Sequence, residues 1–145
     1  MSHTDQTGHP EDPLTRASNV LTQFFRHLDQ SDYPAMATLL DGEWHRQGKA
    51  LNSPASLIEA LSTRSRTRRI HHLLTNISGE QAPDGSVALT AYMLVVQHEP
   101  GGPLDGPAPL DGISSIRTLR ATAAPSPDGW RLRWIKSDPQ SFAAV

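Results

Sequence analysis

Apolar residues recur every three or four positions between Leu14 and about Gln30, the spacing that places side chains on one face of an α-helix. The residues of this stripe are Leu14, Ala17, Leu21, Phe24, Phe25 and Leu28. The pattern predicts an amphipathic first helix that is interrupted at Ser31–Pro34. Pro34 then favours the first turn of a short second helix, which we expect Asp41-Gly42 to end.

A short strand is expected at Glu43–Gln47, followed by a third helix. Asn52 or Ser53 is a suitable N-cap for this helix, because a short polar side chain there can accept a hydrogen bond from a free backbone N–H group. Pro54 fits the first turn, since its missing N–H would have no partner in the helix. The helix should end near Arg64.

Four segments rich in apolar and β-branched residues follow the third helix, and each predicts a strand. They are Ile70–Ser78, Val87–His98, Ile113–Thr122 and Trp130–Lys136. Turn residues at Pro83–Gly85 and Pro127–Gly129 predict hairpins, whereas Pro100–Gly112 predicts a longer, mobile loop near the rim of a pocket or dimer. Helices followed by strands indicate an α+β fold, with three helices packed on a strongly curved, mainly antiparallel sheet.

One domain is expected over residues 14–139, with short tails at residues 1–13 and 140–145. The first tail has too few apolar residues to offset the entropy of ordering it. Val95 and Val96 are adjacent in the second long strand, so apolar side chains point to both faces of the sheet. Because the helices cover only one face, the other face favours a homodimer.

The composition excludes several classes of function. The 145 residues include no cysteine, which rules out disulfides, thiolate metal ligands and cysteine nucleophiles. The net charge of −2 gives no overall attraction to nucleic acid or to an anionic membrane. The chain also lacks a secretory signal and a stretch of about 20 apolar residues that could span a membrane. We therefore expect a cytoplasmic protein without nucleic-acid or membrane partners.

The remaining polar clusters do not predict a metal or a phosphate site. Of the seven histidines, His3 and His9 lie in the first tail, and the others have no carboxylate at a recognised ligand spacing. The basic cluster consists of Arg64, Arg66, Arg68 and Arg69. Cations are favoured near a helix C-terminus, and no aromatic residues alternate with them, so nucleic-acid binding is not expected. Arg69 can still lie at the mouth of a pocket and meet an acidic ligand.

His71 and His72 are neighbours on a strand, so their side chains point to opposite faces. Ile70, His72, Leu74 and Asn76 share one face. A histidine on that face can be a general base or simply a hydrogen-bonded core residue. Tyr92 lies in the middle of the next strand, where a buried phenol can hold a substrate oxygen or only pack.

Asp29 lies one helical turn after Phe25, at the border of the apolar stripe. From there its carboxylate can reach a pocket without crossing the core, although an ordinary solvated residue is the alternative. Asp32 is nearer the centre of the stripe. Its position beside Pro34 favours a different role, as the N-cap of the second helix.

Several motifs resemble those of SnoaL-like proteins, which belong to the nuclear-transport-factor-2-like (NTF2-like) superfamily. The motifs are Phe24–Tyr33, Trp44–Gly48, Arg69–Asn76 and Asp128–Arg131. The resemblance extends over about Leu14 to Pro139 and implies a cone-shaped fold that encloses one pocket for a small molecule. Its members include polyketide cyclases, scytalone dehydratase-like and bile-acid dehydratase-like enzymes, ketosteroid isomerases and non-catalytic dioxygenase subunits, so the fold does not settle the function.

The resemblance also implies a catalytic pair. In the dehydratase branch an aspartate at the end of the first helix pairs with a histidine on the first long strand, and Asp29 and His72 occupy the matching positions. The family's pocket tyrosines are only partly represented, since Leu28 stands where scytalone dehydratase has a tyrosine. That enzyme's second catalytic histidine has no counterpart on the third long strand.

These observations lead to a cofactor-independent acid–base enzyme, a dehydratase, isomerase or cyclase, that acts on a hydrophobic cyclic or polyketide-like carbonyl compound. His72 is the expected base, and Asp29 is expected to fix its tautomer. The expected substrate-binding residues are Phe25, Trp44, His45, Arg69, Asn76 and Tyr92. The alternative is a non-catalytic binding or accessory protein of the same fold. The two hypotheses differ in whether Asp29 and His72 meet in a concave pocket.

Overall fold

The helices begin where their capping residues predict. The computed structural model describes residues 12–143, so most of the predicted first tail, including His3 and His9, lies outside the described residues. The three helices are α1 (Pro13–Asp29), α2 (Tyr33–Thr38) and α3 (Pro54–Leu61). The Asp32 carboxylate accepts a hydrogen bond from the Ala35 backbone N–H, and Ser53 forms a capping box with Ser56. Both predicted caps are therefore confirmed.

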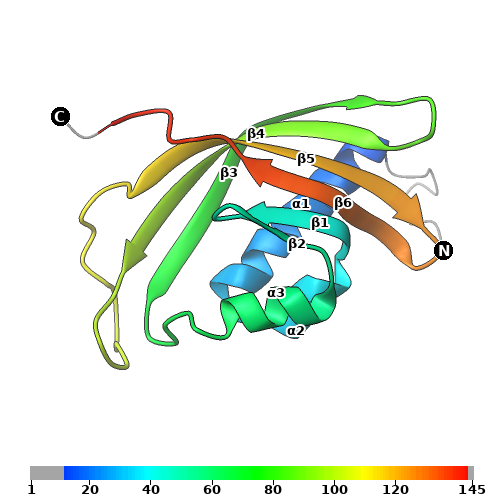
Figure 1. Cartoon of the computed structure of the whole chain (residues 1–145). Coiled ribbons are helices and arrows are strands. Elements are labelled where there is room, and N and C mark those ends of the chain that lie inside the picture. Colours follow the sequence, from blue (N-terminus) through cyan, green and yellow to red (C-terminus); the bar gives the residue numbers. More distant parts are fainter. Residues whose placement is uncertain (1–11, 144–145) are drawn as a thin grey trace.

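A six-stranded sheet curves over one side of α1 (Figure 1). The strands are β1 (Leu40–Arg46), β2 (Lys49–Leu51), β3 (Arg69–Gln81), β4 (Val87–His98), β5 (Ser115–Ser126) and β6 (Gly129–Ser137). Their order in the sheet is β2-β1-β6-β5-β4-β3. All neighbours are antiparallel except β1 and β6, which are parallel. The predicted α+β class, with three helices on a mainly antiparallel sheet, is confirmed.

The end of the second helix differs from the prediction. We expected this helix to continue to Asp41-Gly42, but α2 ends at Thr38 and β1 begins at Leu40. The reason is a long-range contact, because the Leu132 backbone N–H donates to the Leu39 carbonyl oxygen and Leu40 pairs with Leu132 in β6. Pairing with β6 thus determines the conformation of this segment.

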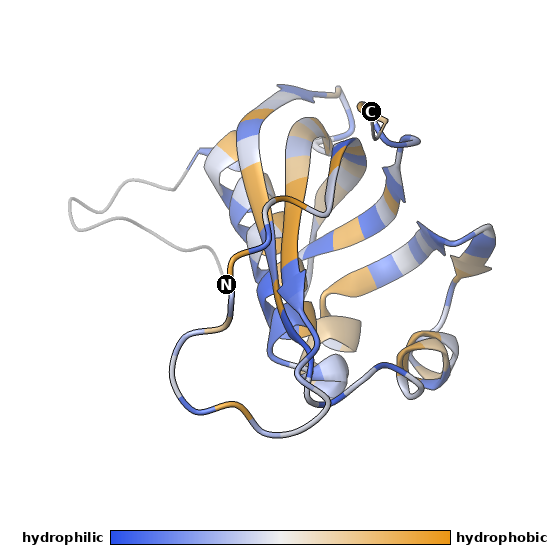
Figure 2. Ribbon diagram, turned by 90° about the vertical axis from the view of Figure 1, so that its left-hand side faces the viewer, coloured by the Kyte–Doolittle hydropathy of each residue, from blue (hydrophilic) through white to orange (hydrophobic). Residues whose placement is uncertain are grey.

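The strands also differ from the prediction. The sequence did not predict β2. Its three residues pair with β1 through a turn at Gln47-Gly48, where both residues have positive φ. The strand expected at Ile113–Thr122 is β5, which begins later, at Ser115, and extends to Ser126. The loop before it, which contains Pro100–Gly112, is without helix or strand and extends beyond the ends of β4 and β5 (Figure 2).

The core lies between α1 and the concave face of the sheet. Leu21 and Phe24 of α1 are fully buried there, as are Leu119 of β5 and Ile135 of β6. Burial alternates along β4, and the resulting bands of apolar and polar residues are visible on the strands in Figure 2. No helix among the described residues is long and apolar enough to cross a membrane. The end of the concave face that α1 leaves uncovered is where a pocket forms.

Candidate functional site

A pocket of about 360 Å³ opens between the C-terminal half of α1, strand β1 and the inner face of the sheet. Its volume is within the range of small-molecule sites, which is about 300–1,000 Å³. The apolar part of its wall consists of Phe25, Leu28, Trp44, Ile70, Met93 and Val95. The polar part consists of His45, Arg46, Gln47, Arg64, Arg68, His72, Ser115, Arg117 and Ser137. The pocket therefore combines an apolar floor with several hydrogen-bond donors.

Asp29 and His72 meet beside this pocket. Asp29 is the last residue of α1, and its Oδ1 lies 2.5 Å from His72 Nδ1. Its Oδ2 accepts a hydrogen bond of 2.9 Å from the His72 backbone N–H, so one carboxylate fixes both the ring and the backbone of this residue. The side chains are only 10% and 15% exposed for His72 and Asp29, respectively. Asp29 and His72, the predicted pair, are therefore in direct contact.

The contact with Asp29 decides which nitrogen of His72 is available. Since a carboxylate only accepts hydrogen bonds, Nδ1 carries the proton, and the neutral ring has its lone pair on Nε2. The ring is also held by Phe25, whose centroid lies 5.4 Å away. His72 lines the pocket, whereas Asp29 contacts His72 and is not part of the pocket wall. The arrangement provides a histidine of fixed orientation, only 10% exposed, on the pocket wall.

His71 points to the opposite face, as strand alternation predicts. Its side chain is exposed, and its Nδ1 lies 2.8 Å from the Ile70 carbonyl oxygen. Ile70 is buried and Leu74 is half-buried on the same face as His72. The predicted orientation of the first half of β3 is confirmed.

Three of the predicted substrate-binding residues lie on the pocket wall. Phe25 and Trp44 are buried, and their rings pack edge-to-face at 6.4 Å, while Trp44 also contacts Phe24 at 5.3 Å. His45 lines the pocket beside Trp44, with its Nε2 2.8 Å from a Glu43 carboxylate oxygen. These aromatic contacts fix the shape of the wall.

The other three predicted binding residues lie away from the pocket. Asn76 has φ 54° at a bulge between Thr75 and Ser78, which changes the facing of β3, so its side chain is exposed. Tyr92 lies on the outer face of the sheet and is 49% exposed, so the expected buried phenol is wrong. Arg69 is exposed and donates 2.8 Å to the Gly106 carbonyl oxygen, which holds the Pro100–Gly112 loop.

Four arginines lie on the pocket wall that the sequence did not predict as site residues: Arg46, Arg64, Arg68 and Arg117. We assigned the 64–69 cluster to a helix terminus, yet α3 ends at Leu61 and two of these residues turn back toward the pocket. Arg117 lies two residues before the buried Leu119 and four before the buried Ala121, so all three share one face of β5. This period of two is a signal in the sequence that Arg117 faces inward.

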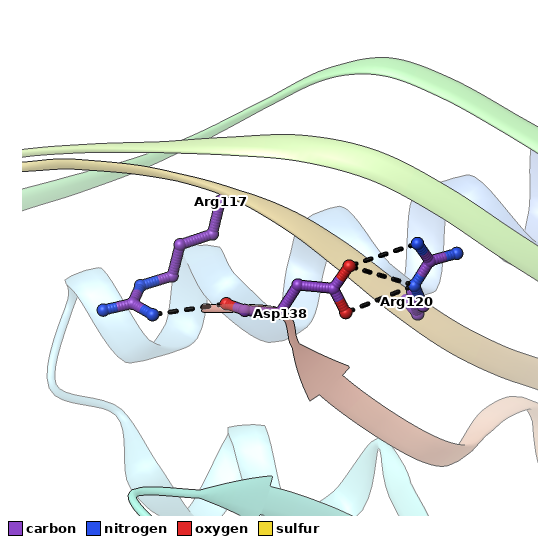
Figure 3. Close-up of polar contacts among 3 residues, drawn as sticks. All are labelled: Arg117, Arg120 and Asp138. Carbon is purple, nitrogen blue, oxygen red and sulfur yellow. Dashed lines mark hydrogen bonds and ion pairs between the residues drawn. The ribbon is translucent and has the colours of Figure 1, made fainter. Parts of the chain in front are cut away.

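The Arg117 guanidinium is held by the end of β6. Its Nη1 donates a 3.2 Å hydrogen bond to the Asp138 backbone carbonyl oxygen (Figure 3). The Asp138 carboxylate instead binds the guanidinium of Arg120, with nitrogen–oxygen distances of 3.1 to 3.3 Å. The carboxylate thus raises the pKa of Arg120, and Arg117 forms no ion pair among residues 12–143.

Burial and mutual repulsion act on the pocket arginines. Burial lowers the pKa of Arg46 and, to a smaller extent, so does the positive charge of Arg68. Burial is also the main cause of the lowered pKa of Arg64, and Tyr33 opposes it, whereas Arg68 and Arg46 add to it. These shifts are expected where cations share a poorly hydrated space. Among residues 12–143, no group of three or more His, Asp or Glu side chains is placed to hold a metal ion.

Comparisons with known proteins show the fold of this chain. No protein-family model and no curated protein sequence matches it. A putative dehydratase of the NTF2-like family from Streptomyces avermitilis superposes with a TM-score of 0.71 at 16% identity, over 90% of this chain and 98% of that one. ActVI-ORFA from Streptomyces coelicolor gives 0.68 at 22% identity, over 86% and 96% of the two chains.

A third similar structure, from Catenulispora acidiphila, was solved in complex with S-DNPA. It gives a TM-score of 0.68 at 16% identity and covers 85% of this chain and 90% of that one. These likenesses, together with the three helices and the curved sheet, define the class. The chain has the NTF2-like fold that the sequence motifs implied.

Proposed function

We propose that this protein is a cofactor-independent acid–base enzyme that acts on a cyclic or polyketide-like carbonyl compound bound in the pocket. The observation that carries the proposal is the Asp29–His72 contact, in which the carboxylate engages Nδ1 of a histidine that lines the pocket, so that Nε2 is the nitrogen without this partner. A dehydratase, isomerase or cyclase begins with the same step. We place dehydration first, because the putative dehydratase from S. avermitilis shares the fold over nearly its whole length.

In the proposed reaction His72 Nε2 removes a proton from the carbon next to the carbonyl group. The electron pair of the broken C–H bond forms an enolate, and the Asp29 carboxylate stabilises the imidazolium. The Trp44 indole N–H or the Ser115 hydroxyl, both on the pocket wall, donates to the enolate oxygen. In dehydration a C=C bond then forms as the C–O bond at the β-carbon breaks. His72 returns its proton to the departing hydroxide, so that water leaves.

The pocket itself supports an organic substrate. Its floor of aromatic and aliphatic side chains offers apolar contacts to a cyclic or polyketide-like compound. The complex of the C. acidiphila structure with S-DNPA indicates that a protein of this fold binds a small molecule. By contrast, a non-catalytic binding protein has no need for a histidine whose two ring nitrogens are differentiated by a carboxylate.

A reaction that does not require the natural substrate to be known tests whether His72 is the base. Proton removal next to a carbonyl group exchanges hydrogen for deuterium in heavy water, and 2-tetralone is a bicyclic ketone suited to this measurement by NMR. The wild-type protein should accelerate the exchange, and His72→Ala should reduce this acceleration by about 10²–10⁴-fold, the usual effect of losing a general base. His71→Ala is the matched control and should exchange like the wild type. Equal rates for wild type and His72→Ala would exclude His72 as the base.

We also propose that the chain forms a homodimer through the outer face of the sheet. Leu73, Leu94 and Ile116 are paired across β3, β4 and β5 and form an apolar row on this face. Leu73 is 46% exposed, and the neighbouring Tyr92 is 49% exposed. A second copy of the same face is the simplest cover for such a row. A cytoplasmic location stays a prediction from the composition.

A further inference from the structure

Four guanidinium groups converge on one pocket from three separate parts of the chain. Arg46 ends β1, Arg64 and Arg68 belong to the segment between α3 and β3, and Arg117 lies on β5. The pocket wall contains no aspartate or glutamate. None of the ion pairs formed among residues 12–143 involves any of these arginines. The described pocket is therefore strongly cationic, although the whole chain has a net charge of −2.

Some of these donors are buried without any partner. Arg64 Nη1 and Arg68 Nε are inaccessible to solvent and make no hydrogen bond within the described residues. Buried nitrogen donors are almost always paired in folded proteins, because an unpaired one loses its hydration without compensation. Asp29 acts on Arg64 and Glu99 on Arg68 only through their charge, since neither carboxylate forms an ion pair with these arginines among residues 12–143. The protein thus keeps two costly donors on residues of the pocket wall.

From this arrangement we infer that the natural substrate carries an ionised acid group, such as a carboxylate, and that Arg64, Arg68 and Arg117 bind it. The planar fork of a guanidinium group matches the two oxygens of a carboxylate. The apolar floor then receives the rest of the molecule. This inference rests on the proposed function only in taking the bound anion to be the substrate. The sequence predicted a hydrophobic ligand, and the arginines indicate instead a ligand with an apolar part and a charged part.

The strand register places the two ends of such a substrate. His72 on β3 pairs with Val95 on β4, which pairs with Ser115 on β5, and Arg117 follows two residues later on the same face. Two strand spacings correspond to about 10 Å. An acid group held by Arg117 therefore lies across the pocket from His72, so that the anion orients the carbonyl end toward Nε2.

A polyanion such as nucleic acid does not fit these observations. The cations line a pocket of about 360 Å³ rather than an extended groove, and Arg66, the remaining member of the basic cluster before Arg69, is exposed and outside this wall. A purely structural role also fits poorly. Arg46 does lie over the Trp44 ring at 5.8 Å, but no similar contact accounts for Arg64 or Arg68 among the described residues.

Calorimetry with two aromatic probes tests the inference directly. The probes 2-naphthoate and 2-naphthamide have the same rings and differ in charge. We expect the wild-type protein to bind the naphthoate at least about tenfold more tightly, because charge-assisted hydrogen bonds are roughly twice as strong as neutral ones. Arg64→Gln and Arg68→Gln should each remove most of this preference, because each weakens the binding of naphthoate far more than that of naphthamide. Arg66→Gln is the matched control and should retain the preference.

Thermal unfolding provides a second readout that does not depend on the choice of probe. Arg64→Met keeps the volume and removes an unpaired buried charge, so the variant should unfold at a higher temperature than the wild type. A lower unfolding temperature would make Arg64 a structural residue and overturn the inference. So would the absence of naphthoate binding, or equal affinities for the two probes.

A His72→Ala variant separates this inference from the proposed function. It should keep the preference for naphthoate, since the arginines that hold the acid group are intact. If the wild type prefers naphthoate but does not accelerate ketone exchange, the anion site is supported and the acid–base function fails. If it accelerates exchange without preferring naphthoate, the function stands and the anion site is overturned.

Discussion

Asp29 acts on His72 at two atoms, the ring Nδ1 and the backbone N–H. This double contact joins the end of α1 to the inner face of β3. It orients the ring and also holds the strand against the helix. Asp29 is therefore a positioning residue, whose effect on a reaction passes through His72.

Asp29→Asn should leave the protein folded and reduce ketone exchange by about 10²-fold or more. An asparagine can accept from the backbone N–H of His72, but its amide group then donates to Nδ1, which moves the ring proton to Nε2 and removes the basic lone pair from the pocket. The ¹⁵N chemical shifts of the ring should report this change of tautomer, which a merely structural role would not produce.

Combining the two substitutions provides an internal check on that result. His72→Ala with Asp29→Asn should be hardly slower than His72→Ala alone, because residues that act as a unit are not additive. If the two effects instead multiply, Asp29 acts independently of His72, and its role as a positioning residue is wrong.

At this scale the sequence predicted the residues whose positions follow from regular geometry. His72 and His71 obey strand alternation, and Asp29 lies at the border of a regular helical stripe. Asn76 was misplaced because a bulge has no reliable signature in a single sequence, and a shift of one residue reverses the facing of a side chain. Arg64 was misassigned since a helix dipole explains a terminal cation as well as a pocket does.

At Gly42, β1 lies close to the backbone of β6. A Cβ atom at this position would lie 2.0 Å from the Arg133 carbonyl oxygen, in the region where the β1–β6 register shifts. Gly42→Ala must therefore push the two strands apart, and we expect a loss of about 1–3 kcal/mol in the free energy of unfolding, measured with urea. Because Trp44 follows on β1, the pocket wall should move as well.

Gly48→Ala is the matched control for this close approach. Gly48 has φ 78°, and a Cβ atom added there would have nothing within 4 Å. Its substitution should cost about 1 kcal/mol from the backbone conformation alone. A loss at Gly42 no greater than at Gly48 would show that the contact with β6 does not constrain β1.

The loop between β4 and β5 is anchored at its start by Glu99. Its carboxylate accepts hydrogen bonds from the Ser65 hydroxyl, the Thr67 hydroxyl and the Gly101 backbone N–H. These hydrogen bonds, that from Ser65 foremost, lower the pKa of Glu99 from its ordinary value of 4.5 to about 2. The same contacts fix the segment that carries Arg64 and Arg68.

Glu99→Gln should reduce stability in a way that depends on pH. A depressed pKa in the folded state stabilises the protein above the unfolded value of 4.5, and this contribution is lost as the pH falls toward about 2. The difference in unfolding free energy between wild type and Glu99→Gln should thus be largest above pH 4.5 and shrink below it. Substitution of the exposed Glu80 by glutamine serves as the control. A difference that stays constant with pH would contradict the role of these hydrogen bonds.

The elements show why boundaries were predicted unevenly. Ser53 and Asp32 define helix starts through contacts within three residues of the chain, so the sequence contains the whole signal. The end of α2 and the position of β1 depend on Leu132, far along the chain. Such pairing has no local signature, and neither does a three-residue strand such as β2.

For the whole molecule, the apolar row of the outer face predicts the oligomeric state. Light scattering should give about twice the chain mass of 15.8 kDa at micromolar concentration. Leu73→Lys, at a side chain that is 46% exposed in the chain, should yield a folded monomer because it places a charge in the proposed interface. Ile58→Lys on α3, where the side chain is 38% exposed, is the control and should remain dimeric. A wild-type monomer would remove the proposal.

The parallel pairing of β1 with β6 also has a consequence for how the chain folds. Of the six described strands β6 comes last in the chain, yet it lies between β1 and β5 in the middle of the sheet. The helices and β1 therefore emerge from the ribosome well before β6 is synthesised. Until then Trp44 of β1 lacks its partner Ile135 in β6. Closure of so long a loop is slow, and the intermediate exposes an unpaired strand edge. Since β6 alone joins β1 to the rest of the sheet and carries Ser137 of the pocket wall, we expect a chain cut before β6 to lose this part of the wall together with the pairing of β1.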